Sequence, residues 1–386
     1  MIPYGKQSIS KEDIDAVINV LQSEYLTQGP AVPAFEKAVS GYCGANYAIA
    51  VNSATSALHL ACLALGVGAG DIVWTTPITF VASANCALYC GAKIDFVDID
   101  TQTYNMSTEK LSKKLKQAQA LGKLPKVVIP VHLCGQSCDM KEIHDLSQKY
   151  GFKIIEDASH AIGGKYKNTY IGNCKFSDIT VFSFHPVKII TTGEGGMALT
   201  NNFTVANKME RLRSHGITRD ASQMTKQPDG SWYYQQIDLG FNYRITDIQA
   251  ALGNSQLKRL DDFVKLRHKI ANSYFQMLQD LPIKLPDQNT ETYSSFHLFP
   301  IRLELENISR SRQEVFDSLR KDGVGVNIHY IPVHTQPYYQ NLGFKIGDFP
   351  EAEQFYSEAI SLPIHPTLSN LEQQQIVDSL TTSLAL

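Results

Sequence analysis

The stretch AIAVNSATSALHLACLAL (residues 48–65) opens with four apolar residues and continues, after Asn52 and Ser53, as an apolar helix-forming segment. This order predicts a buried strand that runs directly into a helix, whose first turn carries Ser53, Thr55 and Ser56. The unpaired N–H groups, the hydroxyls and the positive end of the helix dipole at such a junction favour a bound phosphate. The same hydroxyls also suit simple helix capping, so this segment alone leaves both roles open.

The same alternation continues to about residue 184. Strand-like apolar runs alternate with helix-like segments over 71–80 and 81–92, 93–100, 126–133 and 140–151, 152–159, and 178–184. Such alternation is typical of βα units on a mostly parallel sheet, which predicts the α/β class. Ligands of open α/β sheets bind at the carboxyl ends of the strands, so the residues that follow each apolar run are the candidates for chemistry.

The pattern changes near residue 246. Thr246 and Gln249 form a capping box at the start of a predicted long helix over 247–281. Strand candidates at 294–303 and 324–331, a helix at 310–323 and two closing helices follow, which is typical of a smaller α+β unit. At the other end of the chain, a capping box of Ser10 and Asp13 predicts an amphipathic helix. We therefore expect a large domain over 1–260 and a small domain over 261–386.

The 386 residues carry 35 Lys and Arg against 38 Asp and Glu, a net charge of −3, and no long run of like charge. This balance argues against a nucleic-acid or membrane partner.

No signal peptide or long apolar stretch stands out, so the expected compartment is the cytoplasm. The seven cysteines favour reduced, buried thiols. Cys86 with Cys90, and Cys134 with Cys138, are weak candidates for metal ligands, and no metal is expected.

Two charged residues follow apolar runs. Asp157 comes after FKIIE (152–156), where a carboxylate needs a cationic or donating partner, although helix capping explains it equally well. Lys188 lies in ITVFSFHPVKIITTGEGGM (179–197) between apolar neighbours. Desolvation there favours a neutral, nucleophilic amine, although a lysine extended along the surface is the alternative. A carboxylate, a lysine and a helix N-terminus are together the fixtures that a pyridoxal phosphate site needs.

The motifs NSATSAL (52–58), EDASHA (156–161), SFHPVKIITTGEGG (183–196) and GFNYRITDIQAALG (240–253) resemble, in order and spacing, those of the DegT/DnrJ/EryC1/StrS sugar aminotransferases. The resemblance extends from PYGKQSI (3–9) to SLPIHPTL (361–368). It implies fold type I of the PLP-dependent transferases, with a large α/β domain and a smaller C-terminal α+β domain.

The resemblance also implies the catalytic residues. Lys188 would hold pyridoxal 5′-phosphate (PLP) covalently as a Schiff base and move the proton during amino transfer, with pyridoxamine 5′-phosphate as the intermediate form of the cofactor. Asp157 would pair with the protonated ring nitrogen. His160, where many relatives have Gln, would bond the ring hydroxyl.

Further cofactor contacts follow from the same resemblance. Phe80 would stack on the ring, although it suits a core position equally well. Ser183, Thr55 and Ser56 would hold the phosphate. Asn242 would reach the phosphate bound by the neighbouring subunit, which implies a homodimer with a shared active site.

The loop SxxLTQGP (23–30) and the motif HYIPVH (329–334) most resemble family members of pseudaminic acid biosynthesis. These aminate C4 of a UDP-linked 2-acetamido-2,6-dideoxy-4-hexulose with L-glutamate as donor. The substrate contacts would be Tyr4, Tyr25, Leu26, Thr27, Ala54, His329, Tyr330 and His334, although ordinary packing is an equal alternative for His329 and His334. Other UDP-4-ketosugars, of the bacillosamine or aminoarabinose type, remain alternative substrates. A non-catalytic regulator and a PLP-dependent dehydratase are further alternatives, but the dehydratase relatives replace the lysine at position 188 by histidine.

Overall fold

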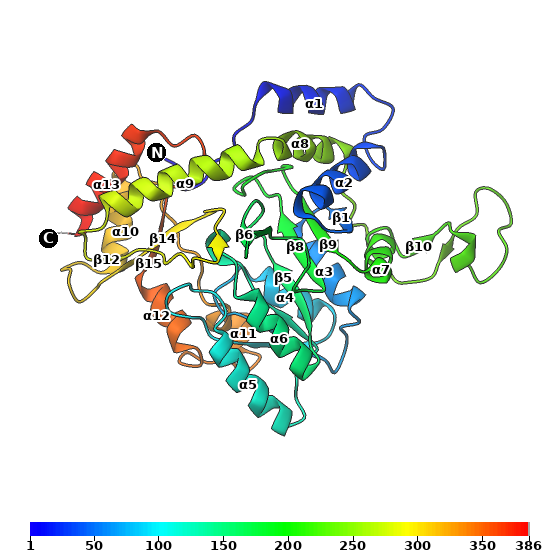
Figure 1. The fold of residues 1–386 in the computed structure, drawn as a ribbon, viewed down its shortest axis with the longest axis horizontal. Coiled ribbons are helices and arrows are strands. Elements are labelled where there is room, and N and C mark those ends of the chain that lie inside the picture. Colours follow the sequence, from blue (N-terminus) through cyan, green and yellow to red (C-terminus); the bar gives the residue numbers. More distant parts are fainter. Residues whose placement is uncertain (385–386) are drawn as a thin grey trace.

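The computed structural model describes residues 1–384, and its centre is a sheet of seven strands (Figure 1). The strands lie in the order β1 (Tyr47–Val51), β9 (Gly196–Thr200), β8 (Ile179–Ser183), β5 (Lys153–Asp157), β4 (Val127–Ile129), β2 (Ile72–Thr75) and β3 (Lys93–Phe96). Only β9 runs antiparallel to its neighbours, and the other pairs are parallel. The expectation of an α/β fold with a mostly parallel sheet is confirmed.

Helices cover both faces of this sheet. One face carries α3 (Ala54–Ala64), α4 (Ala82–Tyr89) and α7 (Phe203–Arg213), and the other carries α2 (Ala31–Cys43), α5 (Thr108–Ala120), α6 (Met140–Tyr150) and α8 (Asp247–Leu257). Side chains along a strand alternate between the two faces: Val181 packs in the first core and Phe182 in the second. Burial on both faces explains why the strands are continuous apolar runs in the sequence.

A second, antiparallel sheet lies beside the first. It consists of β12 (Ile283–Lys284), β14 (Phe299–Leu303) and β15 (Ala359–Leu362). The helices α9 (Leu260–Met277), α10 (Arg312–Lys321) and α13 (Asn370–Leu384) share one apolar core with this sheet. Ile2 packs into the same core, so the start of the chain belongs to this half of the molecule. Two shorter helices of the later chain, α11 (Pro337–Gln340) and α12 (Pro350–Glu358), pack instead in the core of the main sheet.

Two expectations about this half were wrong in detail. The helix expected over 247–281 is two helices, α8 and α9, separated at Lys258 and Arg259. The start of α9, at Leu260, still packs in the same core as α8, and α9 enters the second core only from Ile270 on. The strand expected at 324–331 is reduced to bridges at Val324 and Asn327. The main chain of Ile2 pairs with the start of this segment. Ile2 N donates to Gly323 O, and Gly325 N donates to Ile2 O, both at 2.7 Å.

The capping boxes behave as expected. Ser10 begins α1 (Lys11–Leu21) and Thr246 begins α8, each with its partner three residues on. Figure 1 shows α1 at the periphery, lying along α8. The division at residues 260 and 261 stays a prediction, because Val333, Phe349 and Phe355 pack in the core of the main sheet although they follow that boundary.

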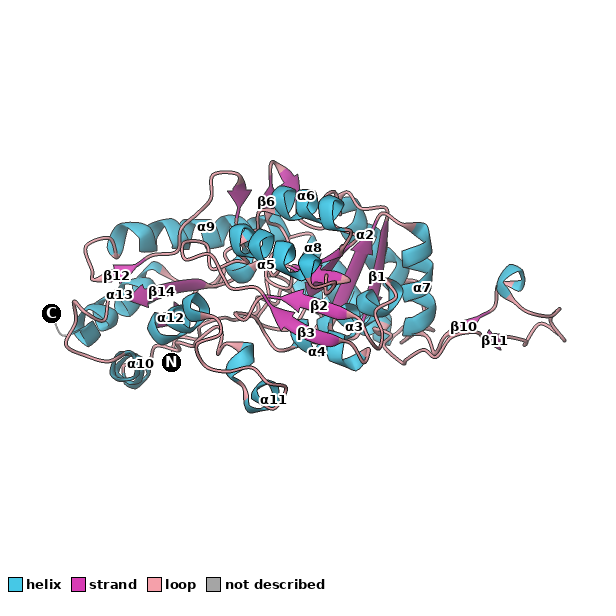
Figure 2. Cartoon of the chain, turned by 90° about the horizontal axis from the view of Figure 1, so that it is seen from below, coloured by secondary structure: helices cyan, strands magenta, loops and turns pink. Residues whose placement is uncertain are grey.

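A long hairpin projects from the body of the molecule (Figures 1 and 2). It follows α7 and contains β10 (Ile217–Thr218) and β11 (Gln235–Gln236). Its apolar side chains are in part exposed: Trp232 by 73% and Leu239 by 82%. A further small sheet, made of β6 (Lys165–Tyr166), β7 (Thr169–Tyr170) and β13 (Thr292–Tyr293), lies between the two main sheets. Among the described residues, no helix is long and apolar enough to cross a membrane.

Candidate active site

A cavity of about 700 Å³ lies at the carboxyl ends of the central strands, against the second half of the molecule. The volume is ordinary for a small-molecule site, for which about 300–1,000 Å³ is usual. The cavity brings together ten of the residues singled out from the sequence. These are Tyr4, Ala54, Thr55, Phe80, Asp157, His160, Ser183, Lys188, His329 and Tyr330.

The N-terminus of α3 opens into this cavity. Ser53 caps the helix by accepting the N–H of Ser56 on its hydroxyl, while Ala54 and Thr55 line the cavity. The first N–H groups of a helix have no intrahelical partner, so this end is suited to an anion. Gly196 lets β9 approach the turn closely, because a Cβ there would lie 2.4 Å from Ala54 N.

Asp157 is the last residue of β5 and is buried. Its Oδ2 accepts a hydrogen bond from Ser83 Oγ at 2.6 Å, and its Oδ1 accepts one from Ser159 N at 3.1 Å. The two hydrogen bonds fix the orientation of the carboxyl group at the wall of the cavity.

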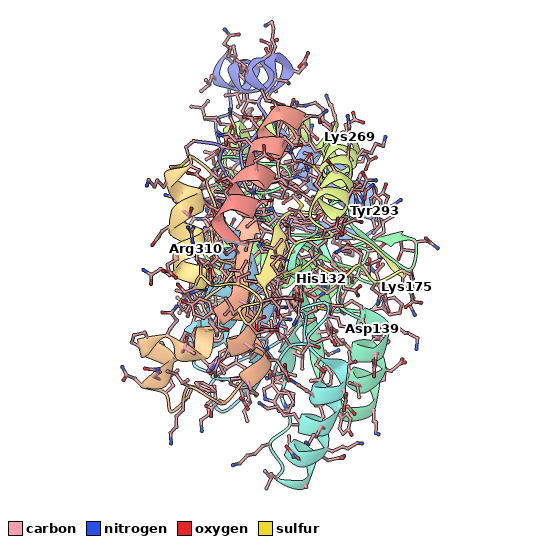
Figure 3. The ribbon with its side chains drawn as sticks, turned by 90° about the vertical axis from the view of Figure 1, so that its left-hand side faces the viewer. His132, Asp139, Lys175, Lys269, Tyr293 and Arg310 are labelled. Carbon is pink, nitrogen blue, oxygen red and sulfur yellow. The ribbon has the colours of Figure 1, made fainter. Side chains whose placement is uncertain are left out.

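The neighbouring residue Glu156 fixes the position of this strand from the other face. Nε2 of His132 donates to Glu156 Oε2 at 2.7 Å, and Nδ1 accepts the N–H of Cys138 at 3.2 Å. Figure 3 shows His132 in the interior of the molecule, whereas Lys175 lies at its edge. Since Val131 pairs with Asp157, the buried contact holds the segment after β4 against the end of β5.

Lys188 lies in the loop that follows β8, five residues after Ser183 at the end of the strand. It is half-buried and lines the cavity. This burial lowers the pKa of its amine to about 8, against an opposing effect of the Asp157 charge. A substantial fraction of the amine is therefore neutral and nucleophilic near neutral pH.

Three buried imidazoles lie near Lys188: His160, His297 and His329. His160 Nδ1 accepts the N–H of Cys134 at 3.3 Å, so its Nε2 carries the hydrogen that points to Tyr330 Oη at 3.1 Å. Burial and the charge of Lys188 lower the pKa of all three, that of His329 to about 3. These imidazoles are therefore neutral, and His160 acts as a hydrogen-bonding group and not as a charge.

Phe80 is 60% exposed at the mouth of the cavity, and its ring lies 6.2 Å from that of Tyr330. An aromatic ring in this position is free to stack on a ligand. The alternative of a core position for Phe80 is therefore wrong.

Six of the expected site residues do not line this cavity. Ser56 points its Oγ to Asn52 Oδ1 at 2.7 Å, and Asn242 lies exposed beside Ser214. His334 is buried and donates through Nε2 to Glu353 at 2.8 Å. Of the two roles considered for His334, the structure therefore favours packing over a substrate contact. The remaining three are the exposed loop residues Tyr25, Leu26 and Thr27.

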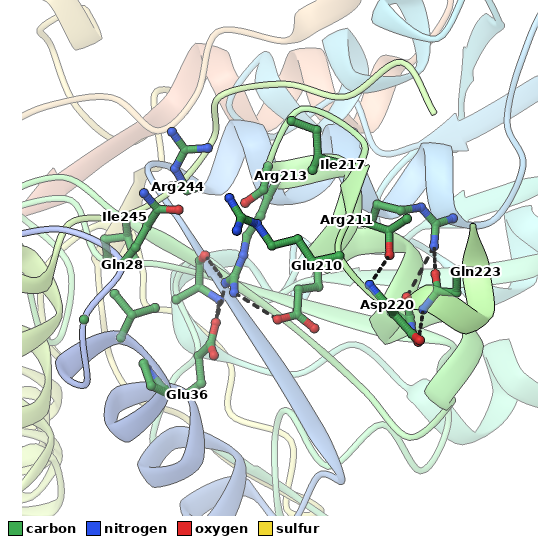
Figure 4. A pocket seen from close by; sticks show the side chains of 18 residues that line it. Gln28, Glu36, Glu210, Arg211, Arg213, Ile217, Asp220, Gln223, Arg244 and Ile245 are labelled. Carbon is green, nitrogen blue, oxygen red and sulfur yellow. Dashed lines mark hydrogen bonds and ion pairs between the residues drawn. The ribbon is translucent and has the colours of Figure 1, made fainter. Parts of the chain in front are cut away.

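That exposed loop leads to a second cavity, of about 510 Å³, which Figure 4 shows from close by. Gln28 and Gly29 line it, and Asp247 holds the loop by accepting the N–H of Gly29 at 2.7 Å. On the opposite wall Arg213 pairs with Glu36 (Figure 4). The loop and the main cavity are thus separate within one chain.

The main cavity also contains residues that sequence reasoning missed. Asn52, Ser159, His185, Glu194, His297 and Asn327 line it, and Ser83 holds Asp157 from α4. The position of Asn52 directly after a strand was a usable signal. Ser83 and His297 lie inside apolar segments and carry no such signal. No three His, Cys, Asp or Glu side chains within residues 1–384 are arranged to hold a metal ion.

Comparisons with known proteins agree with this geometry. The sequence model of the DegT/DnrJ/EryC1/StrS aminotransferase family matches residues 7–381. The UDP-4-amino-4,6-dideoxy-N-acetyl-beta-L-altrosamine transaminase of Campylobacter jejuni is 39% identical over 389 residues, which covers 100% of this chain and 98% of the relative.

Solved structures are similar over the full length. Helicobacter pylori PseC, an aminotransferase of pseudoaminic acid biosynthesis, superposes with a TM-score of 0.90 at 32% identity and covers 99% of each chain. The putative sugar aminotransferase Spr1654 of Streptococcus pneumoniae in its PMP form has a TM-score of 0.89 at 31% identity, again over 99% of each chain. Spr1654 is also known in a PLP form.

Proposed function

Since the chain belongs to the DegT/DnrJ/EryC1/StrS family of PLP-dependent sugar aminotransferases, we propose that it transfers the amino group of L-glutamate to C4 of a UDP-linked 2-acetamido-2,6-dideoxy-4-hexulose. The product would be UDP-4-amino-4,6-dideoxy-N-acetyl-β-L-altrosamine, a precursor of pseudaminic acid. The single observation that carries the chemistry is the cavity that Lys188, with its lowered pKa, shares with Asp157, which Ser83 anchors. The relatives from Campylobacter and Helicobacter support the substrate.

The residues of the cavity fit PLP. The open N-terminus of α3, with Thr55 and with Ser183 nearby, suits the phosphate. Asp157 suits the ring nitrogen, and Phe80 offers an exposed ring for stacking. Lys188 is the one lysine of this cavity among the described residues, so it is our choice for the covalent link.

The cofactor, when bound, supplies an aldehyde that takes up the amino group and a cationic ring that withdraws electrons. Asp157, oriented by Ser83 and Ser159, would pair with the ring nitrogen and favour its protonated form. His160 donates a hydrogen bond through Nε2 as a neutral group, because its Nδ1 accepts the N–H of Cys134. Lys188 Nζ takes the proton from the amino-bearing carbon of glutamate and returns one to C4 of the sugar.

The sugar nucleotide would enter past Phe80. Tyr4, Ala54, His329 and Tyr330 line the cavity and remain our candidates for the sugar. A dehydratase is the less favoured alternative, because Lys188 occupies the cavity where those relatives have histidine.

The pKa of Lys188 predicts how the protein without cofactor takes up PLP. Only the neutral amine attacks an aldehyde, so the uptake rate should rise about tenfold per pH unit below pH 8 and level off above it. The measurement is the growth of visible absorbance after PLP is added to the apoprotein between pH 6.5 and 10. A solvated lysine would give an uptake rate that still rises about tenfold per pH unit at pH 9.5. Such a result would contradict the lowered pKa of Lys188.

The substrate is tested by turnover of two UDP-linked 4-ketosugars with glutamate. We expect kcat/KM to be at least tenfold higher for the L-arabino 4-hexulose than for the D-xylo isomer, a difference of about 1.4 kcal/mol in transition-state binding. The D-xylo isomer and a UDP-4-ketopentose represent the bacillosamine and aminoarabinose alternatives. Preference for either one would replace the proposed substrate but leave the aminotransferase chemistry intact.

We also propose a homodimer with a shared site. The residues that miss the cavity within one chain, Asn242 and the loop 25–27, are exposed, and the hairpin that precedes Asn242 exposes Trp232 and Leu239. Exposed apolar side chains of this kind mark an interaction surface. A second copy of the chain would cover them and bring Asn242 to its partner's cofactor.

Asn242→Ala is the corresponding test. The loss of a polar partner should weaken PLP binding by about 1–3 kcal/mol. A mixture of Asn242→Ala with Lys188→Ala should regain activity, because a heterodimer contains one site with both residues intact. The measurement is activity after verified subunit exchange, with each variant alone as the control. Absence of regained activity in exchanged dimers, or an active monomer, would refute the shared site.

A further inference from the structure

Three cysteine side chains gather between two helices that form the cavity. Cys62 lies on α3, Cys86 on α4, and Cys90 ends α4. Cys62 Sγ is 3.7 Å from Cys86 Sγ, and Cys90 follows Cys86 about one helical turn later, at the end of α4. Cys62 and Cys86 are fully buried, whereas Cys90 is half-buried. A thiol within reach of solvent therefore has a buried thiol as its direct neighbour.

The surroundings of Cys90 favour its thiolate. Hydrogen bonds from Cys62 and from His59 lower the pKa of Cys90, in spite of partial burial. The pKa of Cys62 is raised, because its proton is shared with Cys86 and Cys90. The thiolate is the reactive form of cysteine. Cys90 is thus the nucleophile of the pair, and Cys62 is the neighbour that retains its proton.

The cluster is connected to the cavity through α4. Cys86 Sγ donates to Ser83 O at 3.3 Å, and Ser83 Oγ in turn donates to Asp157 Oδ2 at 2.6 Å. The other helix, α3, opens the cavity with its N-terminus. A covalent bond from Cys62 to Cys90 would tie these two helices together about two turns along α4 from Ser83.

We propose that Cys90 and Cys62 form a site of reversible oxidation by peroxides, at which a disulfide links α3 to α4 and slows the reaction in the cavity. The Cys90 thiolate attacks a peroxide oxygen, the O–O bond breaks, hydroxide leaves and a sulfenic acid forms. The Cys62 sulfur then attacks the sulfenic sulfur, and water leaves with the thiol proton. In total two thiols and one hydrogen peroxide yield one disulfide and two waters. The oxidation itself does not depend on the proposed function, but the effect of the disulfide on the reaction in the cavity rests on the proposed function.

The first test is chemical and uses the PLP-loaded full chain. After treatment with hydrogen peroxide and blocking of free thiols, non-reducing peptide mass spectrometry should find a Cys62–Cys90 disulfide. In the reduced protein, iodoacetamide at pH 7 should alkylate Cys90 at least tenfold faster than the buried Cys174. Cys90→Ser should abolish the disulfide, and Cys174→Ser, a buried thiol outside the cluster, should leave it unchanged. Absence of the disulfide, or a Cys62–Cys86 bond that forms equally in Cys90→Ser, would overturn the proposal.

The second test measures the glutamate half-reaction before and after oxidation. We expect at least a fivefold loss of rate that a dithiol restores, in the wild type and in Cys174→Ser but not in Cys90→Ser. An unchanged rate in fully cross-linked protein would overturn the coupling to the cavity. A reduced protein without any glutamate half-reaction would refute the proposed function, whereas the mass-spectrometric result would still decide the oxidation site.

Discussion

Lys188→Ala is expected to lower turnover by at least about 10⁴-fold and to shift the absorbance of the PLP-loaded protein from that of a Schiff base to that of the free aldehyde. The variant lacks the amine that links the cofactor and moves the proton, and proton transfer alone typically contributes 10²–10⁴-fold. Borohydride reduction of the wild type should add the cofactor's mass to the peptide that contains Lys188. The alanine variant should show no such peptide, although it should still bind PLP through the open end of α3.

The matched control is Lys175→Ala, which removes an exposed lysine at the edge of the molecule (Figure 3). It should behave as the wild type in both measurements. Activity of Lys188→Ala within tenfold of the wild type, or cofactor mass on another lysine peptide, would show that Lys188 does not hold the cofactor.

Asp157→Asn should slow the glutamate half-reaction by about 10²–10³-fold, which corresponds to about 3–4 kcal/mol in the barrier. Asparagine has nearly the same shape but no charge, so it cannot keep the ring nitrogen protonated. The Schiff-base absorbance should persist, because Lys188 is intact. Single-turnover absorbance changes after glutamate addition measure the rate, and the retained Schiff-base absorbance separates this variant from Lys188→Ala.

Ser83→Ala is the graded comparison for Asp157→Asn. It removes the 2.6 Å hydrogen bond to Asp157 but leaves the carboxylate, so a loss of about tenfold is expected, consistent with about 1–1.5 kcal/mol for one such contact. If Asp157→Asn stayed within threefold of the wild type, the carboxylate would have no part in activating the cofactor.

The fold and the two central charged residues were predictable for a local reason. A buried parallel strand is a continuous apolar run, so its end is visible in the sequence, and parallel strands place their ends at one edge of the sheet. Asp157 directly follows the apolar run at 152–156, and Lys188 lies in the loop after the run that ends at Ser183. The structure brings both to one cavity.

The misjudged elements depended on contacts between distant segments. The helix expected over 247–281 divides at Lys258 and Arg259, and α9 passes from the core of the main sheet at Leu260 into the second core at Ile270. The propensities of its residues say nothing about that change of partner. The strand expected at 324–331 loses its pairing because the N-terminal Ile2 bonds to its main chain. His334 lies in the core with Glu353 instead of reaching the cavity, which its position in the motif at 329–334 did not indicate.

The order of the apolar runs was sufficient for the mostly parallel sheet and for placing Lys188 in a loop after a strand, because each depends on residues that are neighbours along the chain. The resemblance of the motifs, from residues 52–58 to 240–253, indicated the family. The burial that lowers the pKa of Lys188, the anchoring of Asp157 by Ser83 and the contact of Cys62 with Cys86 came only from the packed molecule. Each of these joins segments that are far apart or helices that meet only after the sheet has formed. Desolvation and hydrogen-bond geometry are properties of that packing, and no local pattern encodes them.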